Sequence, residues 1–166
     1  MKYFAYGSNM SQKRLQKRVP SATKIGKYYL DRHKLCFHKA SEDGSAKCDA
    51  LFTDDSSDII IGALFQMDES ERTYLDNVEG LGNGYDDKYV QVSCEKGIYT
   101  EALIYVATHI DKNLQPYSWY LNHVIIGAIE TGLPDNYVST LKQISSIDDP
   151  DHTRDLFERQ IYSEAS

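Results

Sequence analysis

Two short segments, far apart in the chain, carry the side chains best suited to chemistry. The first, Tyr3-Phe4-Ala5-Tyr6-Gly7-Ser8-Asn9, is an apolar run that ends in a glycine and two small polar residues. The second, Leu75-Asp76-Asn77-Val78-Glu79-Gly80, has a carboxylate directly before a glycine. Together they offer backbone N–H groups that can hold an anion and a carboxylate that can move a proton.

The first segment is predicted to be a buried strand that turns directly into a helix. Gly7 would permit a positive φ and the close approach of a ligand to the backbone. The helix N-terminus behind it would add partial positive charge, so the turn can hold a carboxylate or a developing oxyanion. The spacing alone also fits, and by itself favours, an ordinary turn in which Ser8 or Asn9 caps the helix.

Glu79 is expected at the end of a short helix, before a loop that contains Gly80, Gly82 and Gly84. A carboxylate there lies near the negative end of the helix dipole. If it is also partly buried, its pKa rises toward the range that a general base needs. Taken alone, the pattern is more often a solvated glutamate beside a glycine that caps a helix.

The elements that must position these segments come with strands first and helices later. Strands are expected at residues 2–6, 25–30, 33–38, 48–53, 59–67, 89–94 and 99–106. Helices are expected at residues 10–18, 116–131 and 136–145. A further helix is expected between Asp68, its N-cap, and Gly80, its C-cap. Because there is no regular βαβ alternation, this order favours an α+β fold with a mixed or antiparallel, barrel-like sheet.

The chain is expected to form one domain over residues 1–166, with an acidic tail from about 147 that either covers the surface or stays mobile. Its net charge of −7 disfavours nucleic acid and anionic membranes as partners. The N-terminal apolar run is too short for a signal peptide, and no stretch is long enough to span a bilayer, so we expect a cytoplasmic protein. Cys36, Cys48 and Cys94 lack the spacing of a disulfide framework or a zinc site.

In their order along the chain, the motifs resemble those of the γ-glutamyl cyclotransferase family, which has the AIG2-like and butirosin-pathway-like cyclotransferase fold. The resemblance spans roughly residues 3 to 134 and rests on four pieces: Tyr6-Gly7-Ser8-Asn9; Glu79-Gly80; Tyr85 followed by Val90 and Val92; and a late helix with Tyr120, Val124, Gly127-Ala128 and Gly132-Leu133-Pro134. Each piece is weak alone, and the four in this order are fairly specific.

The resemblance implies a single-domain mixed β-barrel flanked by helices, and an intramolecular aminolysis that needs no cofactor and no metal. Glu79 would be the catalytic acid and base, and the partner would be a small-molecule γ-glutamyl substrate, bound by a monomer or a homodimer. The products would be 5-oxoproline and a released amino acid or amine. The implied substrate-binding residues are Tyr3, Phe4, Ala5, Tyr6, Gly7, Ser8, Asn9, Tyr85 and Tyr120.

Several alternatives remain open at this point. Tyr89 competes with Tyr85 for the pocket position, and the segment 38–49 is either a lid or a plain hairpin. A non-catalytic binding module of the same fold is the alternative function, although binding alone does not need a basic carboxylate at position 79. The leaving group is also open, including that of a γ-glutamyl-protected antibiotic precursor. A Cys/His hydrolase built on Cys36 and His38 is disfavoured, because no helix N-terminus would activate the thiol.

Overall fold

A computed structural model of the chain describes residues 1–163. Five strands close into a barrel in the order β1-β5-β2-β6-β7. Their bounds are Lys2–Ala5 for β1, Thr23–Asp31 for β2, Ile59–Gln66 for β5, Tyr85–Ser93 for β6 and Tyr99–Ala107 for β7. β1 is antiparallel to β5 and parallel to β7, so the barrel is mixed. The predicted α+β class with a mixed barrel is confirmed.

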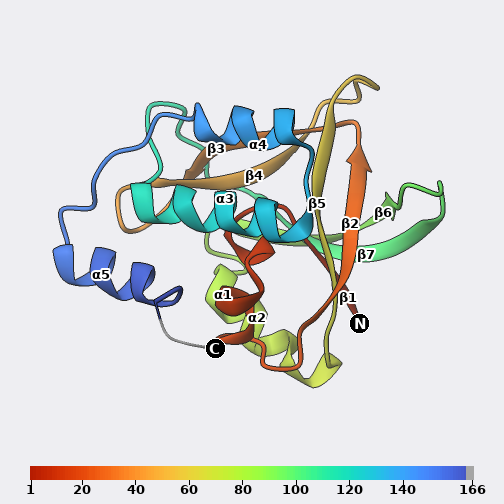
Figure 1. The fold of residues 1–166 in the computed structure, drawn as a ribbon, viewed down its shortest axis with the longest axis horizontal. Coiled ribbons are helices and arrows are strands. Elements are labelled where there is room, and N and C mark those ends of the chain that lie inside the picture. The colour runs from red at the N-terminus through yellow and green to blue at the C-terminus, as the bar shows by residue number, and fades with distance from the viewer. Residues whose placement is uncertain (164–166) are drawn as a thin grey trace.

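A two-stranded hairpin stands beside the barrel and was not foreseen as a separate sheet. It consists of β3 (His33–Ala40) and β4 (Ala46–Phe52), and Figure 1 shows it on the same side of the barrel as α3 and α4. The side chain of Asp49 in β4 accepts a 2.8 Å hydrogen bond from the backbone N–H of Ala107 at the end of β7. At the end of β3, the N–H of Ala40 donates to the carbonyl of His109. These bonds tie the hairpin to the barrel rim.

The helices flank the barrel, and several begin differently from the prediction. Their bounds are Ser8–Met10 for the 3₁₀ turn η1, Gln12–Gln16 for α1, Glu69–Glu71 for the 3₁₀ turn η2, Arg72–Glu79 for α2, Ser118–Thr131 for α3, Asp135–Lys142 for α4 and His152–Gln160 for α5. The helix expected from residue 10 is thus a 3₁₀ turn followed by the short α1. Its cap is Ser11, whose side chain accepts from the N–H of Arg14, and not Ser8 or Asn9.

Two expectations for the helix that carries Glu79 have different outcomes. Asp68 precedes η2 as predicted, but its side chain makes no capping hydrogen bond. The N–H of Glu71, which such a cap would bind, already donates to the backbone carbonyl of Asp68. Gly80 does end α2, in the left-handed conformation with φ of 74°. A residue with a side chain rarely adopts that φ, so glycine fixes where the helix stops and where Glu79 lies.

The core fills the barrel and the space under α3. Its fully buried side chains include Phe4, Met10, Leu15, Leu64, Phe65, Leu75, Leu103 and Ile104. Gly127 lets α3 lie directly on η1, since a Cβ there would come within 2.4 Å of Ser11 N and 2.6 Å of Met10 C. The turn that follows β1 is therefore clamped between the barrel and α3.

The tail from residue 147 includes α5, which packs beside α3 (Figure 1). His123 of α3 lies fully buried, with its Nε2 2.8 Å from Glu158 Oε2 of α5. Asp149, which precedes α5, accepts a 2.8 Å hydrogen bond from the indole N–H of Trp119. The last part of the expected tail, residues 164–166, lies outside the described residues. Among the residues described, no helix has both the length and the apolar character to cross a bilayer.

Candidate active site

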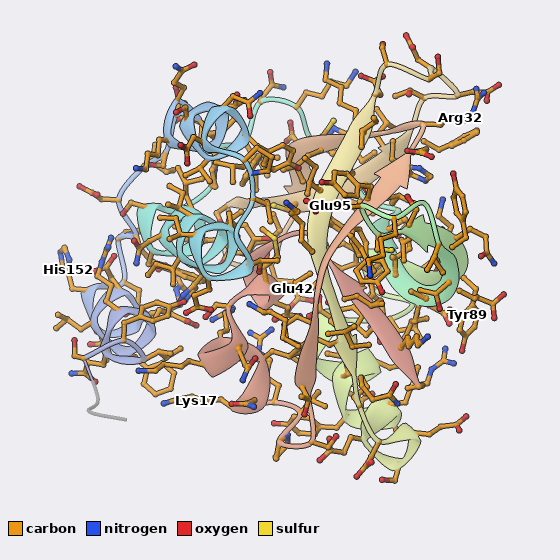
Figure 2. All side chains as sticks on the ribbon, turned by 45° about the vertical axis from the view of Figure 1, so that its right-hand side comes forward. Lys17, Arg32, Glu42, Tyr89, Glu95 and His152 are labelled. Carbon is orange, nitrogen blue, oxygen red and sulfur yellow. The ribbon has the colours of Figure 1, made fainter. Side chains whose placement is uncertain are left out.

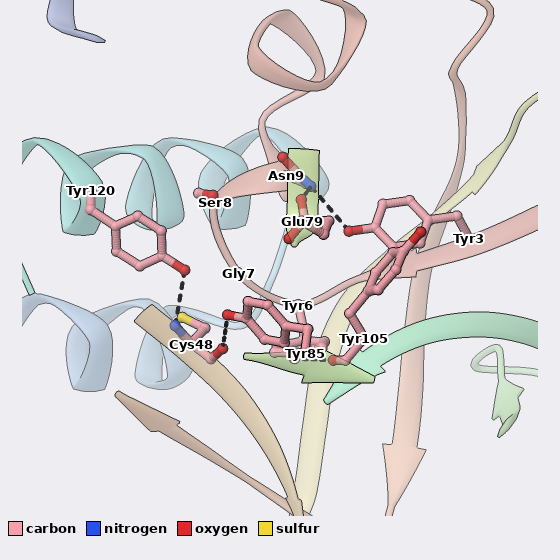
Figure 3. Close-up of a pocket in the computed structure, with 10 residues that line it drawn as sticks. All are labelled: Tyr3, Tyr6, Gly7, Ser8, Asn9, Cys48, Glu79, Tyr85, Tyr105 and Tyr120. Atoms are coloured by element: carbon pink, nitrogen blue, oxygen red, sulfur yellow. Dashed lines mark hydrogen bonds between the residues drawn. The ribbon is translucent and has the colours of Figure 1, made fainter. Parts of the chain in front are cut away.

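A small polar cavity lies where β1, α2, β4 and α3 meet (Figure 3). Its volume is about 30 Å³, and its lining residues are Tyr3, Tyr6, Gly7, Ser8, Asn9, Cys48, Glu79, Tyr85, Tyr105 and Tyr120. A second cavity of about 120 Å³ shares Ser8, Glu79, Tyr85 and Tyr120 with the first. We call the first the inner cavity and the second the outer cavity, and Glu79 stands at their boundary.

Glu79 is fixed by an amide on one side and is open on the other. Asn9 Nδ2 donates a 2.6 Å hydrogen bond to Glu79 Oε1 and also lies 3.1 Å from the hydroxyl of Tyr3. Arg18 Nη1 is 3.5 Å from the same carboxylate oxygen and 3.2 Å from Asn9 Oδ1. Within residues 1–163, Glu79 Oε2 has no hydrogen-bond partner. An oriented carboxylate with one free oxygen facing a cavity can accept and return a proton.

The turn at residues 7–9 lines the cavity, but its backbone conformation differs from the prediction. Gly7 has φ of −116°, so the expected positive φ is wrong. Glycine instead allows close packing, because a Cβ at this position would lie 3.0 Å from Cys48 Cβ and 3.2 Å from Tyr120 Oη, and both neighbours would have to shift. The N–H groups of Gly7, Ser8 and Asn9 meet no acceptor within residues 1–163, whereas Met10 N–H binds Gly7 O. Three consecutive donors are thus available to a ligand.

The tyrosines make a polar wall without charge. Tyr85 Oη donates a 2.6 Å hydrogen bond to the carbonyl of Cys48, and Tyr120 Oη accepts a 2.9 Å bond from the N–H of Cys48 (Figure 3). Tyr6 Oη donates to the carbonyl of Tyr105. Burial raises the pKa of the Tyr6, Tyr85 and Tyr120 hydroxyls well above the ordinary value, so all three stay protonated. Among residues 1–163, Glu79 is the one carboxylate that lines the inner cavity.

Most of the implied substrate-binding residues lie together at this cavity, and two do not. Phe4 and Ala5 are absent from the lining. Phe4 points to the opposite face of β1 from Tyr3 and packs inside the barrel, where its ring would lie 2.8 Å from a Cβ on Gly62. Ala5 shares the face of Tyr3, but its short side chain is buried. Tyr85 lines the cavity, whereas Tyr89 is 52% exposed and lies at the outer edge of the molecule (Figure 2).

Cys48 and Tyr105 were missed by the sequence analysis. Both belong to predicted strands whose alternation gave no sign of a ligand, and only closure of the barrel and docking of the hairpin bring them to the site. The hairpin of residues 38–49 forms one wall of the cavity through Cys48. His38 does not reach the cavity, because its Nε2 pairs with Asp49 Oδ2 at 2.7 Å. Burial raises the pKa of the Cys48 thiol to about 12, which makes it a poor nucleophile.

Comparison with known proteins agrees with this geometry. Residues 59–141 match the sequence model of the AIG2-like family. The chain is 32% identical to the γ-glutamylcyclotransferase of Bos taurus over 151 residues, which cover 88% of this chain and 79% of that protein. It is 31% identical to the γ-glutamylcyclotransferase of Homo sapiens, with the same coverage. A solved structure described as γ-glutamyl cyclotransferase superposes with a TM-score of 0.88 at 27% identity, covering 99% of both chains.

A mixed barrel with a carboxylate at its rim, and matches of this extent, define an enzyme of the cyclotransferase type. The chain belongs to the γ-glutamylcyclotransferase family.

Proposed function

We propose that this protein cyclises γ-glutamyl amides to 5-oxoproline with release of an amino acid or an amine, and that Glu79 is its acid/base catalyst. The observation that carries the proposal is the orientation of Glu79, whose Oε1 is held by Asn9 while Oε2 stays free at the cavity. A carboxylate held in this way can accept a proton from the substrate and return it. The relatives named γ-glutamylcyclotransferase support the same activity.

In the proposed reaction, Glu79 first accepts a proton from the α-ammonium group of the substrate. The amine then attacks the γ-carbonyl carbon to close a five-membered ring. The nucleophile and the electrophile belong to one molecule, so the enzyme needs to supply orientation and not the association of two reactants. As the bond to the leaving nitrogen breaks, protonated Glu79 returns its proton to that nitrogen. The ring nitrogen still carries two hydrogens after the attack, so it loses one of them to Glu79, which passes this proton to the released amine.

The remaining requirement is stabilisation of negative charge on the γ-carbonyl oxygen. The N–H groups of Gly7, Ser8 and Asn9 are donors without an acceptor in residues 1–163, and they are positioned before the substrate binds. Donors fixed in advance act where charge develops and need no reorganisation during the reaction. We assign them to the oxyanion or to the glutamyl carboxylate. Proton transfer and charge stabilisation of this kind require no metal and no cofactor.

The direct test is to incubate the protein with a panel of γ-glutamyl dipeptides and γ-glutamylamines and to measure 5-oxoproline by mass spectrometry. Formation of 5-oxoproline together with an equal amount of the free amine supports the proposal. Release of free glutamate instead would indicate hydrolysis and would contradict it. Binding without product from any compound of the panel would favour the non-catalytic module.

We further propose that the protein acts in the cytoplasm, as a monomer or homodimer, on small molecules and not on nucleic acid or membranes. The charge of the chain supports the last point: with 25 acidic against 18 basic residues, the protein repels the phosphate groups of nucleic acid and lipid at neutral pH. Size-exclusion chromatography with light scattering would give the oligomeric state.

A further inference from the structure

The outer cavity is unusually rich in positive charge. It is lined by Arg14, Arg18, Lys39 and Lys47, and Glu79 is the only acidic residue among residues 1–163 that lines it. The whole chain has a net charge of −7, so a cluster of four cations in one cavity runs against its general composition. Cations gathered beside a reacting carboxylate point to an anionic group on the ligand.

Lys39 differs from the other three cations because it has no anionic partner. The other three form the pairs Arg14–Glu158, Lys47–Asp43 and Arg18–Glu79. No carboxylate within residues 1–163 lies within 4.0 Å of the Lys39 ammonium, and the lysine makes no side-chain hydrogen bond there. Yet Lys39 is only 8% exposed. The residue is thus largely covered, while its ammonium lines the outer cavity and can pair with an anionic ligand there.

The fold makes specific room for this side chain. A β-bulge shifts the register of β3 between Phe37 and Lys39. The loop after Glu79 passes against the lysine stem at Gly84, where a Cβ would lie 2.8 Å from Lys39 Cε and 3.0 Å from Nζ. The ammonium rests 4.7 Å from the ring centroid of Tyr85. The side chain is thus held against a cavity wall and does not extend freely into solvent.

The position of Lys39 relative to the two cavities indicates which part of the substrate it meets. Lys39 lines the outer cavity and not the inner one, whereas Glu79 and Tyr85 line both. If Glu79 serves the reacting bond, that bond lies at the boundary. The inner cavity, closed by Tyr3, Tyr6 and Tyr105, then faces the glutamyl group, and the outer cavity faces the leaving group.

We propose that Lys39 is a specificity-determining residue that binds a carboxylate of the leaving group, so that γ-glutamyl amides with an anionic leaving group react in preference to neutral γ-glutamylamines. This inference rests on the proposed function. Burial lowers the pKa of Lys39, while the nearby Glu79 raises it, and an incoming carboxylate would further favour the charged ammonium.

The test compares two substrates that differ only in charge, γ-glutamyl-alanine and γ-glutamyl-alaninamide. Lys39→Met keeps most of the side-chain length and removes the charge. We expect kcat/KM for γ-glutamyl-alanine to fall about 10- to 100-fold, mainly through KM, because a charged hydrogen bond is lost. For the uncharged alaninamide we expect a change of less than about 3-fold. Lys34→Met, an exposed lysine of the same strand, is the matched control and should alter neither value.

An equal loss of kcat/KM for both substrates, or a loss in kcat alone, would overturn the inference. Lys39 would then position Glu79 or stabilise the fold. Calorimetric binding of both compounds to Glu79→Gln, with and without Lys39→Met, tests Lys39 independently of turnover. A preference for γ-glutamyl-alanine that Lys39→Met removes supports the inference, even if the wild-type protein forms no 5-oxoproline and the proposed function fails. Equal binding of the two compounds, or no binding, contradicts it.

Discussion

The amide of Asn9 and the carboxylate of Glu79 are joined by a 2.6 Å hydrogen bond across 70 positions of sequence. Asn9 belongs to the turn after β1, and Glu79 is the last residue of α2. The bond therefore couples the two segments that the sequence marks as chemical. It also holds one carboxylate oxygen in place and leaves the other at the cavity.

Replacing Asn9 with leucine, which has a similar shape but no donor, should lower kcat about 10- to 100-fold. Glu79 would lose the hydrogen bond that orients it, and misplacement of a catalytic group lowers the rate steeply. Steady-state kinetics with the best substrate of the panel measure the effect. A kcat near that of the wild-type protein would mean that Arg18 alone is sufficient to orient Glu79.

Glu79→Gln should abolish turnover while the protein stays folded. The glutamine can still accept the Asn9 hydrogen bond but cannot take a proton, and loss of a general base costs roughly 10²- to 10⁴-fold in rate. Glu69→Gln, at an exposed position of η2, is the control. A Glu79→Gln variant that retains more than about a tenth of the activity would remove Glu79 from the mechanism.

Gly7→Val should impair catalysis far more than Ser8→Ala. A side chain at position 7 would collide with Cys48 and Tyr120 and fill the space beside the backbone donors. Ser8→Ala leaves those donors in place and should cost no more than one hydrogen bond, about 1 kcal/mol. Both variants need thermal melts, since Gly7→Val also pushes on the hairpin. If Ser8→Ala is as damaging as Gly7→Val, the Ser8 hydroxyl has a direct role in catalysis.

Alkylation of thiols should leave the activity unchanged and should begin at Cys94. Hydrogen bonds from the backbone N–H groups of Ile98 and Lys96 lower the pKa of Cys94. Burial raises the pKa of Cys36, and it raises that of Cys48 to about 12. Because the thiolate is the reactive form, iodoacetamide should label Cys94 first. Peptide mass spectrometry with parallel activity assays checks this, and inactivation that tracks modification of Cys36 would revive the Cys/His interpretation.

The free energy of unfolding should fall as the pH drops below about 6.5, because His123, which joins α3 to α5, binds a proton more readily in the unfolded chain. Burial lowers the pKa of His123 to about 4, so the unfolded chain binds this proton from about pH 6.5 downward and the folded protein does not. Burial alone would raise the pKa of Glu158, but the hydrogen bond with His123 and the charge of Arg14 lower it to about 2. The stability from Glu158 is present above about pH 4.5 and is lost toward pH 2.

Thermal melts between pH 7.5 and 4.5 measure this dependence. His123→Gln removes the titrating ring, so its melting temperature should depend less on pH between about 6.5 and 4.5 than that of the wild-type protein. His152→Gln is the control, because His152 is exposed at the start of α5 (Figure 2). Identical pH profiles for wild type and His123→Gln would contradict the assignment.

The sequence by itself determined the local features of this protein. Apolar alternation and turn residues predicted the strands of the barrel within a few positions, and Gly80 predicted the end of α2, because these signals act between neighbours in the chain. The order of the motifs also indicated the family, and Glu79 and Tyr85 do lie at one cavity.

Only the tertiary structure decided which side chains meet. The strand pattern of Phe4 could not say whether it faces the cavity or the barrel core, and nothing local marked Cys48 or Tyr105 as lining residues. The preference for glycine at position 7 arises from close contact with a hairpin and a helix distant in sequence, not from its own φ. The absence of a carboxylate within 4.0 Å of the Lys39 ammonium, among residues 1–163, likewise depends on the bulge in β3 and on the loop after Glu79. Such contacts depend on barrel closure and docking, which sum over many long-range interactions that no short segment encodes.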